Sequence, residues 1–121
     1  MAPVLSQPSL PFPISAGHRE ALHLSRNDLL TVKRRAQQGC GVLGLRFTDD
    51  PACPPERFET LRRELGDGFE GIEIDSSPGN PHGIAKSAHS VVTTDLVDEA
   101  GHPTQAALHR VLDVFRTRLE N

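Results

Sequence analysis

The spacing of apolar residues changes several times along the chain, and each change marks a predicted element. Residues 41–50 hold a short, nearly continuous apolar run that ends in turn residues, which is typical of a strand buried on both faces of a parallel sheet. Residues 69–74 alternate apolar and charged side chains, which predicts a second strand nearer the edge of the sheet. Residues 3–6 are compatible with a third, short strand.

Helical spacing occupies the segments between and after these strands. Ser25 resembles the N-cap of a helix that Gly39 ends, and residues 55–65 form a second helix opened by proline. From Thr104 onward, the apolar positions follow the i, i+3, i+4, i+7 pattern of a packed helix. The side chains of that predicted apolar face are Leu108, Val111, Leu112, Phe115 and Leu119.

The order of these elements predicts the fold class. A strand, a helix and a strand joined by short connections form a βαβ unit, which implies a parallel pair with a right-handed crossover. We therefore expect an α/β protein with a few-stranded, mostly parallel sheet and flanking helices. Residues 75–103 carry turn chemistry and His82, His89 and His102. A loop of this length in a compact domain is usually functional or disordered.

Composition and charge exclude several classes of partner. The 121 residues suffice for one modest domain, with 36% hydrophobic residues and neither Trp nor Tyr. A net charge of −3 does not fit the basic surface of a nucleic-acid-binding protein. No apolar stretch has transmembrane length, and the N-terminus lacks the features of a signal peptide. These observations predict a cytoplasmic protein with neither nucleic-acid nor membrane partners.

Candidate chemistry begins where the buried strand ends. Asp49 and Asp50 follow it directly, at the edge where open α/β sheets place ligands, although Asp is also a common turn residue. His89 lies in the loop after the next strand. In α/β-hydrolases the catalytic residues follow one another as nucleophile, acid and histidine, so an Asp and then a His suit the last two places.

Four segments resemble the dienelactone hydrolase-like branch of the α/β-hydrolase superfamily. They are residues 44–50, 55–67, 88–93 and 110–115, and the resemblance extends from about residue 3 to residue 119. It implies a partial α/β-hydrolase fold in which Asp50 is the triad acid and His89 the triad histidine. It also implies hydrolysis of an ester or lactone through a covalent acyl intermediate, without a cofactor. Asp49 stands where this branch usually has Gly.

The nucleophile of that branch is missing from the sequence. Neither Gly-x-Ser-x-Gly nor Gly-x-Cys-x-Gly occurs, and the nearest imitation, around Cys40, precedes a strand instead of following one. The donors of the oxyanion hole come from the same missing region. Residues 1–121 therefore resemble a single partial domain, the C-terminal half of such a hydrolase. We expect it to be inactive alone and to act on a small ester or lactone if an N-terminal half completes it.

Two other interpretations stay open. The loop histidines His82, His89 and His102 with Asp75 or Asp98 could bind a metal, although their spacing matches no motif, and we expect no metal. Cys40 and Cys53 are too far apart for a metal or redox pair motif. Alternatively, the chain is a non-catalytic remnant or interaction module whose exposed strand edges and helix faces associate with a second copy or a partner chain.

Overall fold

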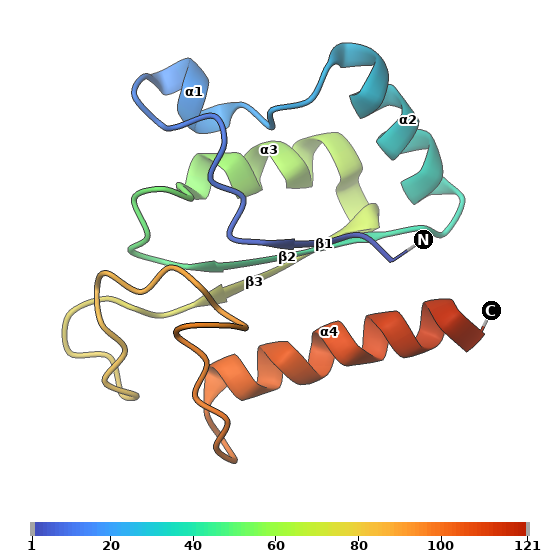
Figure 1. The fold of residues 1–121 in the computed structure, drawn as a ribbon. Coiled ribbons are helices and arrows are strands. Elements are labelled where there is room, and N and C mark those ends of the chain that lie inside the picture. Colours follow the sequence, from blue (N-terminus) through green and yellow to red (C-terminus); the bar gives the residue numbers. More distant parts are fainter. Residues whose placement is uncertain (1, 121) are drawn as a thin grey trace.

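Three parallel strands form the centre of the computed structural model, which describes residues 2–120 (Figure 1). They are β1 (Val4–Ser6), β2 (Val42–Phe47) and β3 (Phe69–Ile74), in the order β1-β2-β3. The prediction of an α/β fold with a parallel sheet is confirmed. Residues 1 and 121, which the predicted domain included, lie outside the described residues.

Helices lie on both faces of this sheet. In Figure 1, α1 (Ala16–Glu20), α2 (Arg26–Gln37) and α3 (Pro55–Leu65) lie on one side, and α4 (Pro103–Glu120) lies on the other. A 3-10 turn, η1 (Gly66–Gly68), joins α3 to β3. The three predicted helices are confirmed, whereas α1 was not predicted. Within residues 2–120, no helix combines the length and the apolar character that a membrane span requires.

The central strand β2 is buried along its whole length. Its side chains alternate between two apolar clusters, one on the α3 side of the sheet and one on the α4 side. Gly44 of β2 pairs with Gly71 of β3, and a Cβ at Gly44 would come within 2.8 Å of the Phe69 ring. The two glycines therefore leave room for Phe58 of α3, whose ring meets that of Phe69 edge-on at 5.4 Å.

One charged residue of β2 is also buried. Arg46 is 1% exposed, and its guanidinium donates to the Glu73 carboxylate at 2.6 Å. It also donates to the main-chain carbonyls of Cys53 at 2.9 Å and Thr48 at 3.0 Å. Burial alone would raise the pKa of Glu73, but hydrogen bonds from Arg62 and Arg46 outweigh it and lower that pKa. The buried charge is thus paired and fully bonded, as burial requires.

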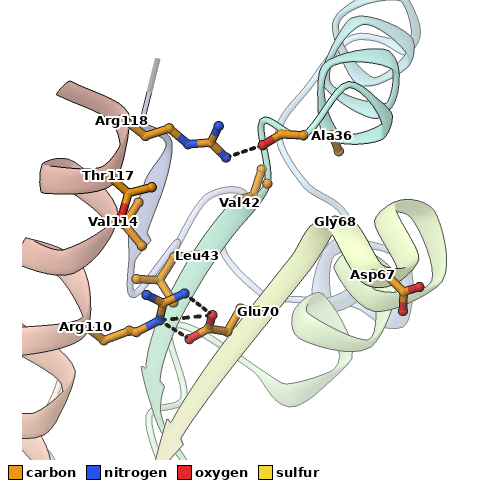
Figure 2. A pocket seen from close by; sticks show the side chains of 12 residues that line it. Ala36, Val42, Leu43, Asp67, Gly68, Glu70, Arg110, Val114, Thr117 and Arg118 are labelled. Atoms are coloured by element: carbon orange, nitrogen blue, oxygen red, sulfur yellow. Dashed lines mark hydrogen bonds and ion pairs between the residues drawn. The ribbon is translucent and has the colours of Figure 1, made fainter. Parts of the chain in front are cut away.

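The face that α4 packs against the sheet differs from the prediction. Thr104, Ala107 and Val111 are buried, and Figure 2 shows Arg110 reaching from α4 to Glu70 of β3, with Nη2 and Oε1 2.8 Å apart. The prediction was wrong for three members of the expected face. Leu112, Phe115 and Leu119 are 45%, 39% and 86% exposed. At about 100° per residue they lie on the flank of α4 opposite Arg110, beyond the buried face.

A second buried arginine fixes the N-terminal segment. Arg57 of α3 is 1% exposed, and burial lowers the pKa of its guanidinium below the ordinary value. Its nitrogen atoms donate to main-chain carbonyls of residues 8–21, a segment whose one regular element is the five-residue α1. The acceptors are the carbonyl oxygens of Pro8, His18 and Ala21, each at 2.8 Å, and that of Pro11. Arg57 therefore ties the segment to α3, together with the ion pair of Arg19 with Glu56 at 3.0 Å.

Removing that guanidinium should destabilise the protein. We expect Arg57→Met to lower the free energy of unfolding by about 3 kcal/mol, because several half-buried carbonyls lose a charged donor together. Urea unfolding measures the loss, and limited proteolysis should show new cleavage within residues 8–21. Arg63→Met is the matched control on the exposed face of the same helix. Equal stability of the two variants would contradict the anchoring role of Arg57.

Candidate functional site

Asp50 lies in the turn that follows β2, and its side chain is almost completely buried. The turn is closed by the main-chain N–H of Asp50, which donates to the carbonyl of Phe47 at 3.3 Å. Carboxylate Oδ1 accepts the N–H of Ala52 at 2.9 Å, the local side-chain contact that makes Asp a frequent turn residue. One carboxylate oxygen is thus used within the turn, and Oδ2 is left for a partner from elsewhere.

Side-chain hydroxyls tie the ends of β2 and β3 together. The N–H of Thr48 donates to the carbonyl of Ile74 at 2.9 Å and so continues the parallel ladder past the strand. The N–H of Ser76 donates to Thr48 Oγ1 at 3.1 Å, and the N–H of Asp49 donates to Ser76 Oγ at 3.0 Å. The loop after β3 therefore leaves the sheet directly beside the turn that holds Asp50. Sequence analysis missed this pair of hydroxyl residues, which lie one residue after β2 and two residues after β3.

The same loop brings His89 to Asp50. His89 lies between Ala88 and Val91, which are both buried in the apolar cluster on the α4 side of the sheet. Its Nδ1 lies 2.5 Å from Asp50 Oδ2, and Nδ1–H is the donor because a carboxylate only accepts. The predicted proximity of Asp50 and His89 is confirmed. The Asp50 side chain is 2% exposed and the His89 side chain 40%, so the contact joins a dry carboxylate to a ring that reaches solvent.

The main chain of His89 is held by a residue that sequence analysis did not single out. Asp95 Oδ2 accepts the N–H groups of both His89 and Ser90, each at 2.9 Å. In return, the N–H of Asp95 donates to the carbonyl of Ser90 at 3.0 Å. Nothing in the local sequence separates Asp95 from other turn aspartates such as Asp98, so only the folded loop reveals the contact.

The other loop histidines lie apart from Asp50. The rings of His82 and His102 contact each other with centroids 5.3 Å apart, and His102 Nδ1 lies 2.7 Å from Thr104 Oγ1 at the start of α4. Among residues 2–120, no group of three or more His, Cys, Asp or Glu side chains lies close enough together to hold a metal ion. The alternative set of metal ligands is therefore not assembled by these residues.

Neither cysteine is placed as a nucleophile for His89. Cys53 is buried, and burial raises the pKa of its thiol to about 11, which keeps it protonated and inert. Cys40 precedes β2 and so lies at the amino ends of the strands. His89 lies at the carboxyl ends, which are the opposite edge of the sheet.

Two cavities formed by the described residues are lined by other side chains than those of the Asp50–His89 pair. One of about 470 Å³ lies between α4 and the amino ends of β2 and β3, where Arg110 and Arg118 are visible in Figure 2. Another of about 480 Å³ follows the open edge of β3 beside α4. Neither Asp50 nor His89 lines these two cavities, whereas a smaller one of about 250 Å³ is lined by Ala88 and Asp95 of the loop that holds His89.

The chemistry open to this pair follows from the two ring nitrogens. A carboxylate on Nδ1 fixes the imidazole tautomer in which Nε2 carries the lone pair, and it stabilises the imidazolium that forms when Nε2 takes a proton. The arrangement therefore suits a general base that removes a proton from a hydroxyl, a thiol or water.

Comparison of the chain with family models, with curated proteins and with solved structures gives no match.

The tautomer provides a direct test of the pair. In ¹⁵N-histidine NMR spectra we expect the His89 ring to be protonated at Nδ1, with a slowly exchanging, low-field Nδ1–H resonance that Asp50→Ala abolishes. The adjacent Asp49→Ala is the matched control, because the Asp49 side chain makes only a 3.4 Å contact with Thr48. A low-field signal that survives in Asp50→Ala, or a neutral ring protonated at Nε2 alone in the unmodified protein, would contradict the contact.

Proposed function

We propose that this chain is a hydrolase-type domain of the dienelactone hydrolase-like kind, in which Asp50 is the orienting acid and His89 the general base. The observation that carries the proposal is the 2.5 Å contact between His89 Nδ1 and a buried Asp50 carboxylate, at the carboxyl edge of a parallel sheet. That edge is where α/β enzymes assemble their catalytic groups. The substrate class is a small ester or lactone, and the chemistry needs no cofactor.

The topology around the pair supports a partial α/β-hydrolase fold. Three parallel strands lie in sequential order, the acid follows the middle strand, and the histidine lies in the long loop after the third. This is the chain order of acid and then histidine expected for the superfamily. The final helix, α4, returns along the face of the sheet opposite α3 (Figure 1).

Catalysis by the pair requires a nucleophile from polypeptide outside these 121 residues. His89 Nε2 would take the proton of a serine hydroxyl or cysteine thiol as that atom attacks the carbonyl carbon of the ester. The imidazolium would then pass the proton to the leaving alkoxide, which leaves an acyl-enzyme. Water, deprotonated by His89 in turn, would release the acid and restore the nucleophile. Asp50 would keep its proton-free form throughout and hold the ring in place.

The proposal is tested by activity with and without a completing chain. Alone, the protein should show no saturable hydrolysis of an activated aryl ester, because the nucleophile and the oxyanion hole supply much of the rate in triad enzymes. Co-purified with the polypeptide encoded immediately upstream, it should hydrolyse the ester. His89→Ala should then reduce kcat by about 10⁴-fold or more, and Asp50→Ala by a comparable factor.

Two comparisons make this experiment decisive. His82→Ala removes a histidine from the same loop that does not contact Asp50, so it should leave kcat unchanged. Full activity of the completed protein with His89→Ala would refute the proposed role of His89. Saturable turnover by the chain alone that disappears in Cys40→Ala would show that the nucleophile lies within this chain.

A second candidate function, association with another chain, is supported by a different observation. Leu112, Phe115 and Leu119 form an exposed apolar stripe on the flank of α4 opposite Arg110, and Arg110 pairs with Glu70 at the β3 edge. The stripe therefore lies toward β1, whose outer edge is the other end of the sheet. An open strand edge beside an apolar helix flank is a surface that favours protein association.

Charge placed on that stripe should prevent such association. If the surface mediates self-association, the unmodified protein sediments as a dimer or larger species, and the double variant Leu112→Glu with Phe115→Glu sediments as a monomer. Thr117→Glu adds a charge to the opposite flank of α4 and serves as the matched control. A monodisperse monomer with a sharp, cooperative melt before any substitution would contradict self-association.

A further inference from the structure

We propose that Asp95 is a positioning residue for the candidate base: its carboxylate fixes the main chain of His89 so that the imidazole stays on Asp50. The inference rests on the proposed function, in which His89 is the base. It adds a second carboxylate to the site, one that acts through the backbone of the histidine and not on the reacting atoms.

The need for such a residue follows from the unequal scaffolds of the two partners. Asp50 follows directly on β2, a strand buried along its whole length and paired on both sides. His89 lies in residues 75–102, where the structure has neither a helix nor a strand. The flanking Ala88 and Val91 are buried, but apolar packing is non-directional and does not set the direction of the intervening ring. The direction of the ring must therefore be set by hydrogen bonds to the backbone of the loop.

Asp95 supplies bonds of this kind at the histidine itself. One oxygen, Oδ2, accepts two successive N–H groups, those of His89 and Ser90, both at 2.9 Å. The N–H of Asp95 donates to the Ser90 carbonyl at 3.0 Å, which closes a ring between the two ends of the turn. Hydrogen bonds to a charged acceptor are stronger than neutral ones, so the two bonds to Oδ2 restrain the His89 backbone directly.

Asp98 of the same loop provides the comparison. Its carboxylate is exposed and accepts only from the Gln105 side chain at 3.0 Å, so it restrains the start of α4 and not the turn that holds His89. The two aspartates share a loop, a charge and a side-chain length. They differ in whether the carboxylate reaches the His89 N–H.

The experiment compares four proteins by the low-field Nδ1–H resonance of His89 in ¹⁵N-histidine spectra. Asp95→Ala should abolish or strongly broaden that resonance, although Asp50 is intact. Asp95→Asn should retain it, because the amide oxygen can accept the same two N–H groups. Asp98→Ala should leave it unchanged, as in the unmodified protein. A merely structural role would lower the melting temperature of Asp95→Ala and leave the resonance in place, and that result would overturn the inference.

Amide hydrogen exchange of the unmodified protein gives a second test if Asp95→Ala fails to fold. The amides of His89 and Ser90 should exchange about tenfold or more slowly than unprotected amides, because both donate to one carboxylate. Unprotected exchange at both would overturn the inference. The two levels of proposal fail differently. If Asp50→Ala leaves the His89 resonance unchanged, the proposed acid–base pair is refuted. If Asp50→Ala abolishes the resonance but Asp95→Ala leaves it unchanged, only the role of Asp95 is refuted.

Discussion

The parallel pairing of β2 with β3 is the constraint on which the candidate site depends. Because the strands run in the same direction and Phe47 is in register with Ile74, both chains leave the sheet at the same edge. The bond from Thr48 N–H to the Ile74 carbonyl extends this pairing into the turn and the loop. The turn that holds Asp50 and the loop that holds His89 therefore begin side by side. The loop after β3 needs only to fold back to place His89 against Asp50.

The buried charge of Arg46 also fixes the turn that holds Asp50. The Arg46 guanidinium binds Glu73 across the sheet and is shielded from water, because the residue is 1% exposed. Its other nitrogen atoms donate to the carbonyls of Thr48 and Cys53, two residues before and three residues after Asp50. One side chain of the central strand therefore holds both ends of the turn that presents the acid. The energetic cost of burying the arginine is offset by the ion pair with Glu73 and by these two hydrogen bonds.

The elements with an unambiguous period could be predicted from the sequence. The apolar run of β2, the alternation of β3 and the proline-initiated α3 each matched one template, and the strand ends together with the family resemblance indicated Asp50 and His89. The face of α4 could not be assigned, because two adjacent apolar stripes share the helix and periodicity does not tell which one the sheet covers. That depends on where the helix lies on the sheet, and here α4 packs against β3.

The residues that sequence analysis missed act through the main chain. Arg57 binds carbonyls of a segment more than thirty residues away, and Asp95 binds two amides of its own loop, so neither contact leaves a motif. From sequence alone, an arginine on a helix or an aspartate in a turn is expected to be a solvent-exposed charge. Their binding to main-chain groups depends on the burial of the Arg57 guanidinium and on the path of the loop around Asp95, which only the folded structure shows. The five-residue α1 was missed for a related reason, since its contacts with α3 through Arg57 and through the Arg19–Glu56 ion pair are long-range.

The unequal exposure of the two partners fits the role proposed for His89. A buried ionic pair is often no better for stability than well-packed apolar side chains of similar volume, so stability alone gives little reason for an Asp and a His here. The pair is also asymmetric: the Asp50 side chain is 2% exposed and that of His89 40%. A proton-transferring histidine needs this asymmetry, with Nδ1 fixed on a dry carboxylate and Nε2 open to the group that gives up its proton. A core pair selected for packing would bury both side chains and leave neither ring nitrogen of the histidine accessible.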